Sequence, residues 1–174
     1  MKPTTVASNS VFIENGLVEI FGQDLSLGEL PVVWESAVRS FGLAETRGMF
    51  LRSGRAAFYY WLRENGDSLG WREVDFRLLP VPARIKRVLA DAMKWFSDES
   101  FLEGVLSSTG ENWQISATGM AGEGARMECN YFIGMLQEMV CWAGAGKFYP
   151  ARKIECQSDG VECCLIEISK QPVG

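Results

Sequence analysis

The feature that most constrains the fold is a predicted helix in the C-terminal third of the chain that is apolar nearly all round. Over residues 125–143, helical spacing places Met127, Phe132, Ile133 and Met135 on nearly all sides of this helix. A helix without a polar face is buried on all sides. The chain must therefore build its other elements around this helix, and 174 residues are enough to do so within one domain.

Three further helices are predicted ahead of this one. Apolar residues recur at helical spacing over residues 31–41, 44–64 and 82–97. The first of these ends before Gly42, and the second ends at Asn65-Gly66, residue types that tolerate the left-handed end of a helix. Residues 78–82 contain two prolines and predict an extended break, since proline restricts the residue before it.

Strands are predicted on both sides of the long apolar helix. Asn15-Gly16 is typical of a two-residue turn, so residues 11–20 predict a short hairpin. Alternating patterns predict strands over residues 101–107 and 112–118, and a final hairpin over 153–156 and 163–168. The expected class is α+β, with four to five helices on a mostly antiparallel sheet that ends in a C-terminal β-hairpin. Residues 1–10 predict a flexible arm and residues 11–174 a single domain.

Charge and hydropathy exclude several classes of partner. The chain has 22 acidic and 17 basic residues, a net charge of −5, which disfavours general binding of nucleic acid or anionic membrane. No apolar run approaches the length of a transmembrane span, and the first residues lack the apolar core of a signal peptide. We therefore expect a cytoplasmic location.

Histidine is absent from the chain, which narrows the chemistry available to it. A Ser-His-Asp triad, a Cys-His dyad and a His-ligated metal are all excluded. Gly144-Ala145-Gly146-Lys147 only partly matches a phosphate-binding loop, because Phe148 occupies the position of the required hydroxyl. The glycines at 119, 122 and 124 do not form a dinucleotide fingerprint. These observations favour a protein that is not an enzyme.

The five cysteines all lie from position 129 onward, and their odd number predicts reduced thiols. Strand alternation places five residues of the last hairpin on one inward face: Ile154, Cys156, Cys164, Ile166 and Ile168. Cys129, near the start of the buried helix, is the expected third neighbour of Cys156 and Cys164. Three thiolates suit tetrahedral zinc, whereas three buried reduced thiols are the alternative.

Several segments together resemble the 4-vinyl-reductase, or hydrocarbon-binding, domain family. The tail pattern of that family is a Cys at a helix start, a Gly five residues later, then Glu-Cys, a Gly turn, and a Cys eight residues after the previous one. The matching residues are Asn112-Trp113-Gln114-Ile115, Cys129, Gly134, Glu155-Cys156, Asp159-Gly160 and Cys164-Leu165-Ile166-Glu167-Ile168. Gly54-Arg55 and residues 76–80 resemble the family upstream. The resemblance implies a fold like the small TRAPP tethering subunits, homodimerisation and an apolar cavity.

The same resemblance implies a zinc site with one departure. Phenol-sensing members of the family hold zinc through three Cys, corresponding to Cys129, Cys156 and Cys164, and one Glu. Lys153 occupies the position of that Glu here. Glu155 or Cys163 would replace it only if a β-bulge turned one of them inward.

The leading functional hypothesis is a stand-alone module that binds a small apolar or aromatic molecule. Six Trp, ten Phe and seven Met provide an unusual surplus of pocket-forming side chains, although such residues can equally fill a core. The candidate lining residues are Phe58, Trp61, Trp95, Phe132 and Leu136. The family suggests a tetrapyrrole carrier or an assembly factor in pigment synthesis or photosystem biogenesis, with a possible protein-assembly partner. The alternatives are a dimeric adaptor without a small ligand and, with less support, a vinyl-group reductase subunit.

Overall fold

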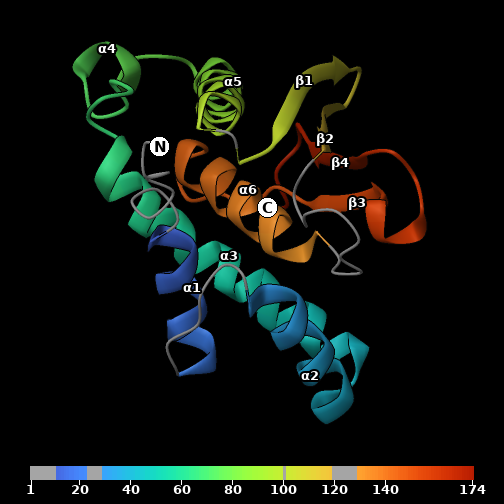
Figure 1. The fold of residues 1–174 in the computed structure, drawn as a ribbon. Helices are drawn as coiled ribbons and strands as arrows, with labels where there is room; N and C mark the ends of the chain where they lie inside the picture. Colours follow the sequence, from blue (N-terminus) through green and yellow to red (C-terminus); the bar gives the residue numbers. More distant parts are fainter. Residues whose placement is uncertain (1–10, 23–28, 100, 119–128) are drawn as a thin grey trace, which may run out of the picture.

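The computed structural model describes residues 11–22, 29–99, 101–118 and 129–174 (Figure 1). Helices precede, interrupt and surround a single antiparallel sheet, which confirms the predicted α+β class. The helices are α1 (Val11–Phe21), α2 (Leu30–Phe41), α3 (Leu43–Asn65), α4 (Val74–Arg77), α5 (Val81–Asp98) and α6 (Asn130–Ala143). The strands are β1 (Glu103–Thr109), β2 (Asn112–Thr118), β3 (Ala151–Glu155) and β4 (Cys164–Ser169), and a short 3-10 turn, η2 (Gln157–Asp159), joins the last two.

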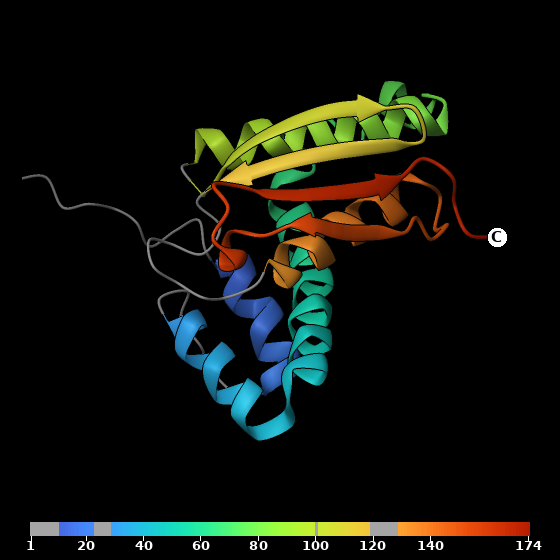
Figure 2. The ribbon, with the colours of Figure 1, turned by 90° about the vertical axis from the view of Figure 1, so that its right-hand side faces the viewer.

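The sheet has the order β1-β2-β4-β3, with every neighbouring pair antiparallel (Figure 2). Ile115 of β2 lies opposite Ile166 of β4, and Trp113 lies opposite Ile168. Because side chains alternate along a strand, this register gathers the buried residues of both central strands on one face. Those residues are Trp113, Ile115, Ala117, Cys164, Ile166 and Ile168.

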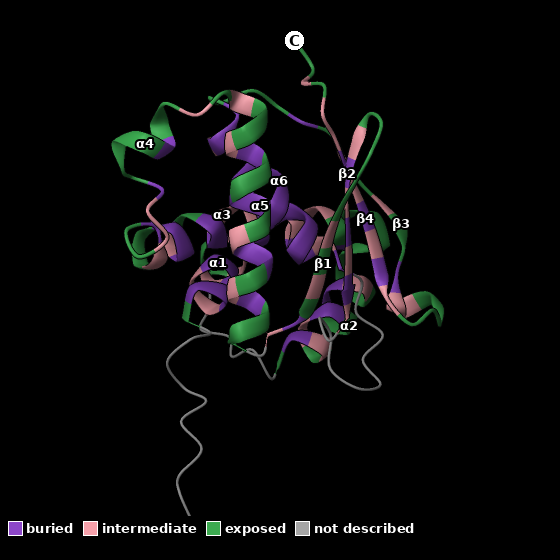
Figure 3. Cartoon of the chain, turned by 90° about the horizontal axis from the view of Figure 1, so that it is seen from above, coloured by how far each residue is buried: buried purple, intermediate pink, exposed green. Residues whose placement is uncertain are grey.

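Helix α6 lies at the centre of the molecule, as its apolar circumference predicts. It contacts α5 and β3 toward the sheet, and α3 on its other side. Helix α3 in turn contacts α1 and α2, which lie farthest from the sheet (Figures 1 and 2). Figure 3 shows the resulting burial: α6 is buried along most of its length, whereas α5 has one buried and one exposed face.

Glycines allow the three central helices to approach closely. A Cβ added to Gly134 of α6 would meet the Leu51 carbonyl of α3, and one added to Gly54 of α3 would meet the Tyr131 carbonyl of α6. Gly16 of α1 faces the Ser53 carbonyl of α3 in the same way. Gly134, five residues after Cys129, is therefore required for a steric reason. It has no Cβ, so α6 can cross α3 at close distance.

The hairpin predicted over residues 11–20 is wrong, because this segment forms the helix α1. Phe12, Ile13, Gly16 and Leu17 are its buried residues, a spacing that fits one face of a helix. Asn15-Gly16 resembled a turn because glycine serves both a tight turn and a close helix crossing. The contact of Gly16 with α3 is a long-range feature that no local pattern shows.

Smaller differences concern element boundaries. Helix α4 was not predicted, and with it the described residues hold six helices rather than four to five. Strand β1 begins at Glu103 rather than at 101, and it extends through Thr109. The start of the helix predicted from 125, the glycines at 119–124 and the arm at 1–10 lie outside the described residues. No helix in the described part of the chain is long and apolar enough to cross a membrane.

The C-terminal hairpin is confirmed, but one of its predicted inward residues points outward. Ile154 is 43% exposed, and the pairing of β3 with β4 shifts register between Lys153 and Glu155. A bulge of this kind inserts one unpaired residue and breaks the alternation. As a result, Cys156 still reaches the interior although Ile154 does not.

Candidate functional site

Three cysteines converge where the C-terminal hairpin meets the start of α6. The ligand-capable sulfur atoms of Cys129, Cys156 and Cys164 all lie within 4.8 Å of one another, and all three residues are buried. The Sγ atoms of Cys156 and Cys164 are 3.7 Å apart. The structure therefore brings together the three residues that the sequence predicted, and we call them the thiol cluster. No other Cys, Asp or Glu of the described residues joins this group.

Backbone and side-chain donors surround the thiol cluster. The Gln157 backbone N–H donates to Cys164 Sγ at 3.3 Å. Hydrogen bonds from the Cys129 and Cys164 thiols lower the pKa of the Cys156 thiol, and the hydroxyl and backbone N–H of Ser158 lower it further. The hydrogen bonds that Cys129 makes with Cys156 and Cys164 raise the pKa of the Cys129 thiol, and burial raises it further. The arrangement thus favours one thiolate shared among three sulfurs, and thiolate is the form that binds metal.

Neither of the two predicted candidates for a fourth ligand, Glu155 and Cys163, lies in the cluster, and Lys153 does not join it either. Lys153 and Cys163 are partly exposed, and Glu155 is exposed. The bulge that the sequence analysis required is present at Lys153–Glu155, but it turns neither carboxylate nor thiol toward the sulfurs. The cluster can hold a metal with three thiolates, and zinc accepts such a donor set together with one further ligand.

A second buried region, the aromatic cluster, lies among α3, α5 and α6. It contains six rings linked by ring-to-ring contacts: Trp61, Trp71, Phe76, Trp95, Phe96 and Trp142. Trp61 is fully buried, with the ring centroids of Trp71 and Trp95 at 5.2 and 5.4 Å. Edge and tilted contacts of this kind stabilise the interior beyond simple burial.

The five predicted lining residues all lie at or next to the aromatic cluster. Phe58 contacts Trp142 at 6.0 Å between ring centroids, and Phe132 contacts Phe96 at 5.6 Å. Leu136 is fully buried in the same core, and Trp95 is the half-buried member of the set. Sequence analysis missed Trp71 and Trp142, because the contact between them joins two segments far apart along the chain and shows in no local pattern.

Two neighbouring tryptophans of the aromatic cluster differ in how their indole N–H groups are satisfied. Trp71 Nε1 donates to Asp91 Oδ2 at 2.9 Å. Trp61 Nε1 is buried and has no hydrogen-bond partner among the described residues. A buried donor without an acceptor costs about 1–3 kcal/mol. The Trp61 N–H therefore marks a position where an acceptor from outside the chain would be stabilising.

Between the two regions, α6 carries a buried carboxylate that is fully paired. Glu138 accepts a hydrogen bond from Arg55 Nε at 2.7 Å and another from Tyr59 Oη at 2.6 Å. Partial burial, together with the hydrogen bond to Glu138, raises the pKa of Tyr59 to about 12. Sequence analysis did not single out this group, although Gly54-Arg55 belongs to the family-like upstream match.

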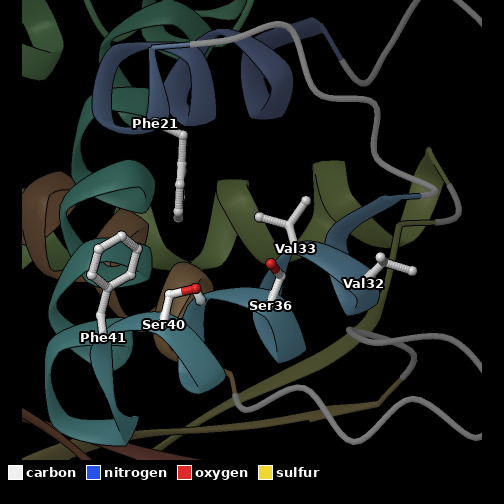
Figure 4. A pocket seen from close by; sticks show the side chains of 7 residues that line it. Phe21, Val32, Val33, Ser36, Ser40 and Phe41 are labelled. Atoms are coloured by element: carbon white, nitrogen blue, oxygen red, sulfur yellow. The ribbon is translucent and has the colours of Figure 1, made fainter.

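A shallow groove of about 250 Å³ lies away from both buried regions, between the end of α1 and the face of α2 that is turned toward it (Figure 4). Phe21 reaches toward it from α1, and Val32, Val33 and Phe41 line it from α2. Val32 and Phe41 are 70% and 60% exposed. The groove shares no residue with the five predicted lining residues.

No protein-family model and no curated protein sequence matches this chain. Among solved structures, the chain is similar to the phenol-responsive sensory domain of the transcription activator PoxR, determined with phenol. The TM-score is 0.57 at 15% identity, over 94% of this chain and 90% of that chain. A structure from work on H-NOX activation has a TM-score of 0.48 at 10% identity, over 93% of this chain and 88% of that chain.

At this level of identity, the likeness to the PoxR domain concerns the fold. The resemblance to the 4-vinyl-reductase family and to TRAPP subunits stays a prediction, as do homodimerisation and a cytoplasmic location.

Proposed function

We propose that this chain binds a small aromatic molecule that carries one hydrogen-bond acceptor, and that the ligand lies against Trp61. The observation that carries this proposal is the buried Trp61 N–H without an acceptor. The similarity to a domain solved with phenol supports a ligand of one ring. The lining residues would be Phe58, Trp61, Trp95, Phe132 and Leu136, and the half-buried Trp95 is the edge through which the ligand enters.

Calorimetric titration with phenol and with toluene tests this proposal. The two probes have similar shape, but only phenol carries an oxygen. We expect the wild type to bind phenol more tightly than toluene. Trp61→Phe keeps a ring and removes the N–H, so its phenol affinity should fall about tenfold while its toluene affinity stays similar. Trp34→Phe, in a buried tryptophan that packs on Phe50 instead, is the matched control. Equal binding of phenol by wild type and Trp61→Phe would contradict the proposal.

A tetrapyrrole is the larger ligand that the family resemblance suggests. If the chain carries or delivers pigment during pigment synthesis or photosystem biogenesis, protoporphyrin should bind at the same site and quench the cluster tryptophans. The fluorescence of Trp95 should then change strongly, because Trp95 is one of the two partly exposed tryptophans of the cluster. Absorption titration with protoporphyrin, in the presence and absence of phenol, tests this alternative. Phenol should weaken protoporphyrin binding only if the two ligands share a site.

We further propose that the thiol cluster holds zinc as a structural ion. Three buried Sγ atoms within 4.8 Å and a backbone donor to one of them support this assignment. Zinc would fasten the C-terminal hairpin to the start of α6 and so fix one end of the helix that carries Phe132 and Leu136. Zinc analysis of purified wild type and Cys156→Ser tests it, because equally low metal in both would exclude zinc.

A dimeric adaptor is the second candidate, and the apolar groove on α2 favours it. A second copy could pack its own α2 antiparallel across Val32 and Phe41, with Glu35 of one helix facing Arg39 of the other. Sedimentation analysis should then show a dimer that Val32→Asp dissociates. Val105→Asp, at an equally exposed valine on β1, should leave it intact. A monomeric wild type would exclude this function.

A further inference from the structure

We propose that the Ser158 hydroxyl is the fourth ligand of the metal in the thiol cluster, completing a site of three cysteines and one serine. This inference rests on the zinc site proposed above and assigns its remaining position. The structure points to Ser158 by three observations: a buried hydroxyl whose only partner is a cluster sulfur, its place in the chain, and the absence of any other ligand-type side chain in the cluster among the described residues.

The first observation is the hydroxyl itself. Ser158 Oγ is buried, and the only partner its hydroxyl has among the described residues is the Cys156 sulfur. A serine hydroxyl on a surface turn ordinarily bonds to water or to nearby backbone. A buried hydroxyl whose only neighbour of this kind is a cysteine sulfur of the cluster is explained if a cation occupies the space among them.

The second observation is local geometry. Ser158 follows Cys156 by two residues on the 3-10 turn η2, and Cys156 is the N-cap of this turn. Its hydroxyl and backbone N–H lie close to the Cys156 sulfur. The preceding residue, Gln157, donates its backbone N–H to Cys164 Sγ at 3.3 Å. The turn thus presents backbone donors to two sulfurs, together with one hydroxyl oxygen at the Cys156 sulfur, as the outer shell of a metal site does.

The third observation is that no other ligand-type side chain joins the cluster among the residues that the structure describes. The chain contains no His, and no further Cys, Asp or Glu of the described residues lies in the group. Electrostatics favours a neutral oxygen as well. Three thiolates already exceed the charge of a divalent cation by one, and a fourth, charged carboxylate would bury a second negative charge. A serine hydroxyl adds no charge. The site can therefore hold a divalent cation although Lys153 occupies the position where a Glu is expected.

Metal titration and cadmium NMR of the full chain test the assignment. Zinc affinity is measured by competition with a chelator for wild type, Ser158→Ala, Ser158→Cys and Asp159→Ala. Asp159 is exposed on the same turn and offers a carboxylate, so its variant is the matched control. We expect Ser158→Ala to lose at least about tenfold in affinity, Ser158→Cys to retain tight binding, and Asp159→Ala to match the wild type.

The cadmium resonance reports the donor set directly. In the wild type it should lie in the range of three sulfurs and one oxygen, and Ser158→Cys should move it into the range of four sulfurs. Wild-type affinity in Ser158→Ala, or loss of metal in Asp159→Ala instead, would overturn the role of Ser158 and leave the zinc site standing. A wild type that binds neither zinc nor cadmium would overturn both.

Discussion

The two ends of α6 are both buried, but they are buried in different ways. At the first end, Cys129 meets two further thiols, so the interior there is polarisable and able to bind a cation. At the other end, Trp142 stacks on Phe76 at 5.9 Å, within an interior of rings. Each region contains one buried polar side-chain atom without a nitrogen or oxygen partner among the described residues: Ser158 Oγ beside the Cys156 sulfur and Trp61 Nε1 among the rings.

The unusual buried polar atoms, rather than the number of apolar side chains, therefore indicate where ligands bind. Buried polar atoms are almost always paired, so each exception calls for an explanation. Glu138, between the two regions, shows the usual case, because its carboxylate is paired with both Arg55 and Tyr59. The following predictions test whether the two ends of α6 behave as separate binding regions.

The largest expected effect is metal-dependent stability of the thiol end. With free zinc at a thousandfold excess over its Kd, the free energy of unfolding should rise by about 4 kcal/mol. Cys164→Ser should abolish this increase, whereas Cys141→Ser, at a half-buried cysteine outside the cluster, should keep it. Chemical denaturation with zinc and with a chelator measures both. An equal response of the two variants would break the distinction between the cluster and the other cysteines.

The next largest effect is expected at the crossing that supports both ends. Gly134→Ala would drive a Cβ into the Leu51 carbonyl and should cost about 3 kcal/mol of unfolding free energy. The control is Gly48→Ala in α3, where the added Cβ would meet only the end of the Arg52 side chain at 3.4 Å. It should stabilise by up to about 1 kcal/mol through helix propensity. Similar thermal shifts in both variants would contradict the steric role of Gly134.

A smaller effect should separate the two neighbouring tryptophans. Trp61→Phe and Trp71→Phe remove the same atoms, so their packing losses should be alike. Trp71→Phe also removes the bond to Asp91, whereas Trp61→Phe removes a donor that has no acceptor. We expect Trp71→Phe to cost about 2 kcal/mol more in the ligand-free protein. Equal losses in denaturation experiments would show that the Trp61 N–H is satisfied in solution.

The smallest effect concerns the paired carboxylate between the regions. The pKa of Tyr59 is raised from 10.0 to about 12, so its contribution to stability is fully present below pH 10 and is lost as pH rises toward 12. Tyr59→Phe should flatten the fall in Tm over this interval relative to wild type. The comparison variant is Tyr60→Phe, because the hydrogen bond of Tyr60 to Glu19 is exposed. A greater flattening in Tyr60→Phe would contradict the assignment.

The helices and strands with strong local patterns could be predicted from the sequence. The spans of α3 and α5 differ from the predictions by one residue at each end, α2 differs by one residue at its start only, and β2 agrees at both ends. The thiol cluster was also predictable, because strand alternation and a buried helix start place three cysteines on the same interior.

Long-range contacts account for what could not be predicted. Gly16 was interpreted as a turn residue because its contact with α3 depends on a helix 37 positions away. The bulge at Ile154 follows from pairing between β3 and β4, and it reversed the expected direction of one side chain. Ser158 belonged to a predicted turn, and only the folded chain shows that its hydroxyl is buried next to the sulfurs.

Native mass spectrometry of the full chain, equilibrated with zinc and with phenol, tests the central claim most directly. The account predicts one zinc ion and one phenol per chain in the wild type. It also predicts separate losses, with less zinc but unchanged phenol in Ser158→Ala, and less phenol but unchanged zinc in Trp61→Phe. A wild type that carries neither, or variants that lose both ligands together, would contradict the assignment of two independent binding regions.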